Sequence, residues 1–148
     1  MRRQAYTVIA LLVLVGSMAV AAQAQTGSRT RLVANIPFEF TVGNKTLPAG
    51  EYQLRSIAGN SVNAVLLMQD RDCKAETLVQ MQTVIGKPQK TVKLIFHAYG
   101  NQYFFAEAWV DGESAGLQAA KPKAERAIEH ELAGVKPTII TVGLIARR

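Results

Sequence analysis

The feature that most constrains the fold is the alternation of apolar side chains across residues 31–42. Every second residue from Leu32 to Val42 is apolar, and most of the residues between them are polar or charged. Successive side chains of a strand point to opposite faces, so a period of two predicts a strand with one buried face. Pro37 lies on the outward face and has no backbone donor, which predicts a sheet edge or a bulge there.

Similar apolar segments recur along the chain, separated by turn signals. Gly43-Asn44 and Gly100-Asn101 are two-residue links typical of hairpins. Leu47-Pro48-Ala49-Gly50 is typical of a type I turn that leads into a strand, and we interpret it as a structural corner rather than a binding loop. Further strands are predicted over residues 62–69, 76–85, 91–99, 102–110 and 138–146.

The segment from Lys121 to Ala133 has a different period. Its apolar residues recur at helical spacing, Pro122 suits a first helical turn, and Gly134 suits the end of a helix. The pattern predicts a helix that packs on the sheet through Ala124, Ala127, Ile128 and Leu132, with Glu125, Arg126, Glu129, His130 and Glu131 in solvent. Taken together, the segments predict a mainly β fold: a single-domain antiparallel β-sandwich or small barrel of about seven strands, with one α-helix in the C-terminal half.

Residues 1–24 have the pattern of a secretory signal peptide. Arg2 and Arg3 precede an apolar run, and Ala22-Gln23-Ala24 forms an A-x-A cleavage site. The pattern predicts export by the Sec route to the periplasm or beyond the cell, with residues 25–148 as a single exported domain and no stable membrane insertion after cleavage. The alternative is an uncleaved anchor, because the apolar run approaches the roughly 20 residues that a membrane span needs.

The charge and the cysteine content exclude several classes of protein. Without Arg2 and Arg3, fifteen basic residues face eleven acidic ones, a net charge of +4. The basic residues are scattered and are not interleaved with aromatic residues, which argues against binding to nucleic acid. Cys73 is the only cysteine, so an internal disulfide is impossible. We interpret it as a surface cysteine in a polar loop, with an intermolecular disulfide or a reactive thiol as the alternatives.

The run NIPFEFTVGNKTLPAGEYQL, residues 35–54, carries a resemblance to a known group. It resembles the N-terminal signature, N-I-P-F-x-F followed by L-P-A-G-x-Y, of small exported bacterial β-rich proteins of unknown function. The resemblance implies an exported β-rich domain. It implies no catalytic or binding residues.

The register of the predicted hairpin over residues 91–110 supplies a candidate ligand site. If Gly100 and Asn101 are the two loop residues, Phe96 faces Phe105 and Leu94 faces Glu107. This register places Phe105, Trp109 and Glu107 on one apolar face, where a carboxylate is costly unless it is paired or hydrated. These three residues are the candidate ligand-binding residues, with Glu107 at the mouth of a cavity. The alternatives are that Glu107 lies at the sheet rim or that a bulge shifts the register.

Motifs for catalysis and for cofactors do not occur in the sequence. The segment Glu129-His130-Glu131 lacks the second histidine of a zinc-protease motif, and Asp70-Arg71-Asp72 continues without the glycine that a calcium loop requires. His97 has no second histidine or acid at ligand spacing and is interpreted as a surface histidine. We therefore expect no catalytic residues, no metal and no cofactor.

The predicted fold and the lack of catalytic motifs leave two classes of function. The first is a non-enzymatic structural or interaction module of the cell envelope, which binds an unknown envelope protein. The second is a lipocalin-like carrier of a small apolar or amphiphilic ligand. A filled interior with Phe38, Phe40, Phe96, Phe105 and Trp109 interlocked would favour the first, and an open apolar cavity would favour the second.

Overall fold

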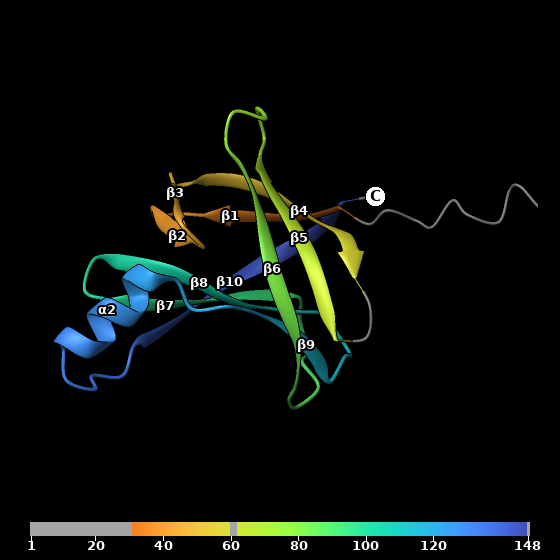
Figure 1. The fold of residues 1–148 in the computed structure, drawn as a ribbon. Helices are drawn as coiled ribbons and strands as arrows, with labels where there is room; N and C mark the ends of the chain where they lie inside the picture. The colour runs from red at the N-terminus through yellow and green to blue at the C-terminus, as the bar shows by residue number, and fades with distance from the viewer. Residues whose placement is uncertain (1–30, 60–61, 148) are drawn as a thin grey trace, which may run out of the picture.

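The computed structural model describes residues 31–59 and 62–147, which form a closed antiparallel β-barrel with a helix against its outer wall (Figure 1). The predicted signal peptide, residues 1–24, lies outside the described residues. The elements are β1 (Arg31–Ile36), β2 (Phe40–Val42), β3 (Lys45–Leu47), β4 (Gly50–Gly59), β5 (Asn63–Asp70), β6 (Glu76–Ile85), β7 (Lys93–Tyr99), β8 (Gln102–Trp109), β9 (Ala115–Ala119), α2 (Lys123–Glu131) and β10 (Thr138–Arg147).

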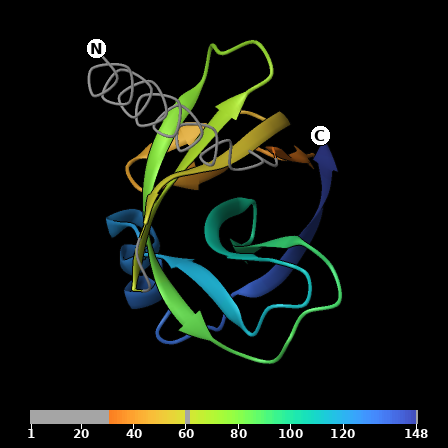
Figure 2. The same ribbon diagram turned by 90° about the vertical axis from the view of Figure 1, so that its right-hand side faces the viewer.

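Eight of these strands close the barrel. Around its circumference they run in the order β1, β4, β5, β6, β9, β8, β7 and β10, and β10 pairs with β1 to complete the ring. All of these pairings are antiparallel, and Figure 2 shows the strands surrounding a common centre. The short β2–β3 hairpin is attached outside the ring by a parallel pairing of Thr41 with Phe104 of β8. The prediction of a mainly β barrel with one late helix is confirmed.

Residues 31–42 do not form one strand, although their alternation is preserved. β1 ends at Ile36, the chain bends over residues 37–39, and β2 resumes at Phe40. The break falls at Pro37, which has no N–H for a continuing ladder. The corner at residues 47–50 is confirmed: β3 ends at Leu47 and β4 begins at Gly50, with the Tyr52 hydroxyl donating a hydrogen bond to the Pro48 carbonyl at 2.7 Å.

Aromatic rings fill the interior of the barrel. The ring of Phe96 makes edge contacts with the rings of Phe38, Phe40 and Phe105, at centroid distances of 5.2, 5.3 and 5.7 Å. Tyr52 makes a further edge contact with Phe40 at 5.3 Å. Offset and edge-to-face geometries of this kind are the favourable ones for aromatic pairs. Aliphatic side chains complete the core, among them Ile36, Leu47, Leu54, Met68, Met81 and Leu94, each almost fully buried.

A bulge in β8 changes the predicted register of the β7–β8 hairpin. Phe96 pairs with Phe105, as predicted, but Ile95 pairs with Glu107, which leaves Ala106 as the extra residue. Leu94 therefore faces Ala108, so the predicted pairing of Leu94 with Glu107 is wrong and the stated alternative, a bulge that shifts the register, is confirmed. The bulge moves the end of β8 by one residue, so its outward and inward positions are exchanged. Glu107 and Trp109 consequently lie on the outer wall rather than on the apolar inner face.

The helix forms where it is predicted, but it packs through a different face. Among the residues of α2, Ala124 and Ala127 are exposed, and Leu132, just after the helix, is 43% exposed. Glu125 is instead only 1% exposed. The predicted apolar packing face is wrong, because the barrel wall under α2 offers polar partners for a carboxylate.

Candidate functional site

Two outward positions of β7 and two positions of α2 meet in a polar cluster. His97 and Tyr99 are two residues apart on β7, so both point outward and lie about 6.8 Å apart along the strand. Glu125 and Glu129 are four residues apart on α2, so they share one face with an axial rise of about 6 Å. The two spacings match, so Glu125 meets both His97 and Tyr99, and Glu129 meets Tyr99. Lys121, just before the helix, completes the cluster.

The centre of the cluster is a contact between His97 and Glu125. His97 Nδ1 lies 2.6 Å from Glu125 Oε1, with the side chains 14% and 1% exposed. A carboxylate only accepts hydrogen bonds, which assigns a proton to Nδ1 as the donor. Burying the carboxylate without this partner would be costly. The interpretation of His97 as a surface histidine, and of Glu125 as a solvated residue, is therefore wrong.

Tyr99 and Glu129 extend the cluster toward solvent. The Tyr99 hydroxyl donates to Glu129 Oε1 at 2.8 Å and lies 3.3 Å from Glu125 Oε1. Burial of the ring, together with the hydrogen bond to Glu129, raises the pKa of Tyr99 far above its ordinary value, so the phenol remains a proton donor. Lys121 Nζ forms an ion pair with Glu129 Oε1, and this contact, followed by the Tyr99 hydrogen bond, lowers the pKa of Glu129.

A pocket of about 220 Å³ opens beside the cluster, and we call it the α2 pocket. β8 pairs with β9 only from Glu107 to Trp109, and the two strands diverge where the β8 bulge begins. The pocket lies at this divergence, near the start of α2. Polar side chains and small or aromatic apolar ones line it: Gln82, His97, Gln118, Lys121 and Glu125, with Phe105, Ala106, Ala119 and Ala120.

The structure separates the three predicted ligand-binding residues. Phe105 is buried in the barrel interior and also lines the α2 pocket. Glu107 and Trp109 lie together on the outer wall, where Trp109 Nε1 donates to Glu107 Oε2 at 2.7 Å. Glu107 pairs across the ladder with Gln118, one of the lining residues, and so flanks the pocket. A binding role for these three residues stays a prediction, but the predicted interior cavity with Glu107 at its mouth is not their setting.

Sequence reasoning missed Glu125 and His97 as partners. They are 28 residues apart, and their meeting depends on where α2 docks. A usable signal was present in the matched spacings, with two polar residues at i and i+2 on a strand and two acids at i and i+4 on a helix. The contact could be proposed from that match only if the helix were already known to cover β7.

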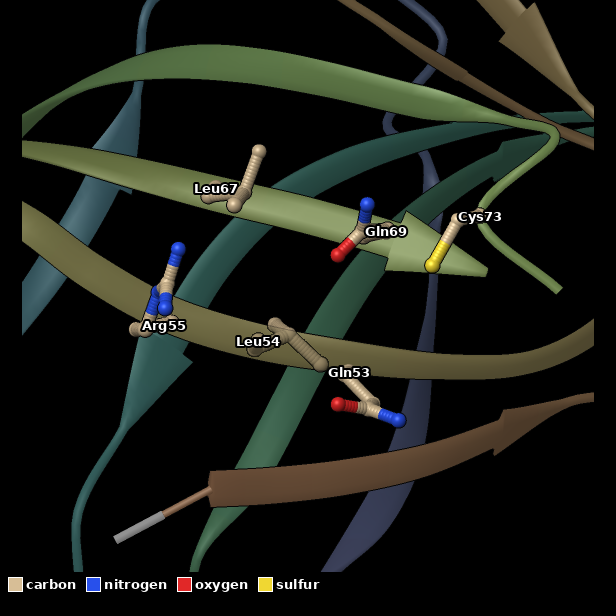
Figure 3. Close-up of a pocket in the computed structure, with 6 residues that line it drawn as sticks. All are labelled: Gln53, Leu54, Arg55, Leu67, Gln69 and Cys73. Carbon is tan, nitrogen blue, oxygen red and sulfur yellow. The ribbon is translucent and has the colours of Figure 1, made fainter. Parts of the chain in front are cut away.

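A second pocket, of about 240 Å³, lies over β4 and β5 (Figure 3). Gln53 and Arg55 come from β4, Leu67 and Gln69 from β5, and Cys73 from the loop that follows β5. Its charged side chain, Arg55, is exposed, and so is Cys73, as predicted. No buried charge marks this pocket among the residues that the structure describes. The α2 pocket is therefore the stronger candidate site.

The α2 pocket combines a carboxylate–histidine pair with amide and lysine side chains. A carboxylate that orients a histidine is part of the arrangement that activates a nucleophile. None of the side chains that line this pocket, within the described part of the chain, is a serine, threonine or cysteine. The described residues also contain no group of three or more His, Cys, Asp or Glu side chains that could hold a metal ion.

Comparison with known proteins found no relative of this chain. The fold is a closed antiparallel barrel with a polar site on its outer wall. A scan against protein-family models, a search of the curated proteins and a search of the solved structures each found no match. The resemblance of residues 35–54 to exported bacterial proteins stays a prediction. In residues 31–59 and 62–147, no helix has the length and apolar character needed to cross a membrane.

Proposed function

We propose that this chain is an exported, non-enzymatic interaction module of the cell envelope that binds its partner on the outer wall of the barrel, at the α2 pocket. The observation that carries the proposal is the packing of the barrel interior. Phe96 contacts the rings of Phe38, Phe40 and Phe105, and such a mutually packed aromatic cluster supports a filled interior rather than one that holds a ligand. Trp109, which was expected to join this group, lies outside and leaves the aromatic core intact without it.

The alternative is a lipocalin-like carrier of a small apolar or amphiphilic ligand. The closed barrel is compatible with this function, because eight-stranded barrels can hold one small ligand. Native mass spectrometry of protein purified from its own host separates the two functions. The interaction module is expected to give the mass of the bare chain and no thermal response to fatty acids. A co-purified small molecule would favour the carrier.

Affinity capture from an envelope extract tests the outer wall directly. Gln118→Lys places a long cationic side chain at the α2 pocket, whereas Gln80→Lys makes the same exchange on the outer face of β6, away from the pocket lining. We expect a protein captured by the wild type and by Gln80→Lys to be lost with Gln118→Lys. Equal capture by both variants would contradict the proposed location of the binding surface.

Export is tested by the intact mass of the secreted protein. Cleavage after Ala24 gives a chain that begins at Gln25. A secreted protein that retains Met1 would contradict the predicted signal peptide.

A further inference from the structure

Glu125 is a buried residue, and only one of its two carboxylate oxygens takes part in the hydrogen bonds of the cluster. Both of its hydrogen bonds, from His97 Nδ1 and from the Tyr99 hydroxyl, reach Oε1. Oε2 receives none from the described residues, and Glu125 is one of the side chains that line the α2 pocket. A carboxylate has about four acceptor sites on its two oxygens. The pocket therefore presents a carboxylate oxygen that can accept a hydrogen bond from a ligand.

Two further polar side chains of the pocket can accept hydrogen bonds. His97 donates from Nδ1 to Glu125, so this ring nitrogen is already engaged. Gln82 and Gln118 are cross-strand partners on β6 and β9, and each contributes an amide oxygen on the same wall. Lys121, the one cationic side chain of the lining, is held at the edge by Glu129. A ligand that brings donors can therefore be accommodated.

The charges around the pocket favour a cation. The cluster holds two carboxylates, Glu125 and Glu129, and one ammonium, Lys121, which pairs with Glu129. Glu107 adds a third carboxylate beside Gln118. A partly buried site with an excess of negative charge attracts positive ligands, because solvent screens it less than it screens the open surface.

We infer that the α2 pocket binds the end of an alkylammonium or guanidinium group, which donates to Glu125 Oε2 and to the amide oxygens of Gln82 and Gln118. The volume of about 220 Å³ equals about seven water molecules at ~30 Å³ each, the size of one such side-chain end. Phe105, Ala106, Ala119 at the end of β9 and Ala120 just after it provide apolar contact for the alkyl portion. The inference rests on the proposed function, since it names the chemistry of the partner at the same site.

The two histidines allow a direct test by NMR. His97 lines the pocket, whereas His130 is exposed in the last turn of α2 and serves as the internal control. We expect titration with n-butylammonium to shift the ring signals of His97 saturably and to leave those of His130 unchanged. Butyrate and n-butanol are expected to cause no saturable shift. A saturable shift with butyrate, or none with butylammonium, would overturn the inference.

Short peptides distinguish a free amine from a side chain of a partner protein. A capped Ala-Lys-Ala peptide and its norleucine counterpart differ only in the terminal ammonium. Stronger binding of the lysine peptide than of butylammonium identifies a protein side chain as the source, and equal binding identifies the free cation; both outcomes support the site. Equal binding of the lysine and norleucine peptides would refute it.

Substitutions in the pocket test which side chains contact the bound cation. Glu125→Gln removes the charge and is expected to weaken butylammonium binding tenfold or more. Because this residue also anchors α2, Gln118→Leu provides a second test that leaves the cluster in place, with an expected loss of about twofold to tenfold. Gln80→Leu, outside the pocket, is the matched control and is expected to bind as the wild type does. Unchanged affinity in both pocket variants would overturn the inference.

The test of the cation site and the test of the proposed function can fail independently. If an envelope protein is captured through Gln118 but no cation binds, the interaction module stands and the cation site is refuted. If cations bind but no partner is captured, the cation site stands and the interaction module is refuted.

Discussion

Phe96 and His97 are consecutive residues of β7, and their side chains point to opposite walls of the barrel. Phe96 is fully buried against three aromatic rings, two from residues 38–40 and one from β8. His97 is almost as well covered, but it depends on one carboxylate at one distance. Apolar burial is non-directional and is shared among many neighbours. Polar burial requires a particular partner. The outer wall is therefore sensitive to a change in the chemistry of a side chain, whereas the inner wall is sensitive to a change in its volume.

The largest effect is expected from a change to the inner wall. Phe96→Ala removes a ring that contacts three others, and we expect the free energy of unfolding to fall by about 3–5 kcal/mol. Urea unfolding followed by circular dichroism measures the loss. Leu78→Ala, at a residue 63% exposed on β6, is the control, with an expected change within about 0.5 kcal/mol. A loss below about 1 kcal/mol for Phe96→Ala would contradict the aromatic core.

The corresponding change on the outer wall removes the carboxylate. Glu125→Ala leaves His97 and Tyr99 without their common acceptor, and breaking a buried pair costs about 3–5 kcal/mol when it is fully enclosed. Because His97 is 14% exposed, we expect a loss of about 2–3 kcal/mol in urea unfolding.

The double variant His97→Phe with Glu125→Leu sharpens this comparison. Replacing both partners with apolar residues removes the unpaired polar groups, so we expect most of the stability to return. A double variant less stable than Glu125→Ala would show that the wall under α2 depends on shape rather than on the polar pair.

Close packing also occurs on the outer wall, around Trp109. A Cβ on Gly116 would lie 2.7 Å from the indole ring, and we expect Gly116→Ala to cost about 1–3 kcal/mol. The fluorescence of the only tryptophan reports any displacement as a red shift. Gly143→Ala, in β10, has no atom within 4 Å of the added Cβ and is expected to change stability by less than about 0.5 kcal/mol. Equal effects at the two glycines would contradict the Trp109 contact.

The smallest effect concerns the solvent edge of the polar cluster. Because the pKa of Glu129 is lowered in the folded state by Lys121 and then by Tyr99, this residue contributes stability above its ordinary pKa of 4.5 and loses the contribution as the pH falls through the lowered value. We expect Glu129→Gln to lose less stability on acidification than the wild type does. Urea unfolding across this pH range checks it, with the exposed Glu131→Gln as control. Identical acid sensitivity in all three proteins would refute the coupling.

The inner wall could be predicted from the sequence and the outer wall could not. Alternation at Leu32, Phe38 and Phe40 indicates which side chains face the core, because a period of two is imposed by the backbone itself. β9 was missed, since Ala115–Ala119 is short and rich in small residues and carries no clear alternation. The bulge at Ala106 also leaves no local signal, yet it reverses the facing of Glu107 and Trp109.

The packing face of α2 illustrates the same limit. Ala124, Ala127 and Leu132 indicated an apolar face, but the position of a nine-residue helix is set by the wall on which it docks. That wall presents His97 and Tyr99, so the helix turns Glu125 inward. The periodicity of apolar residues indicates which face of a helix is hydrophobic. It carries no information about polar partners that lie far away in the sequence.

The pairing of β1 with β10 has a consequence for how the molecule is made. The first and last strands of the barrel are neighbours, so the ring stays open along one seam until the final stretch of polypeptide is available. Contacts between such distant parts of a chain form late. The barrel therefore closes only when β10 meets β1, and until then β1 has only one of its two neighbours in the ring, β4.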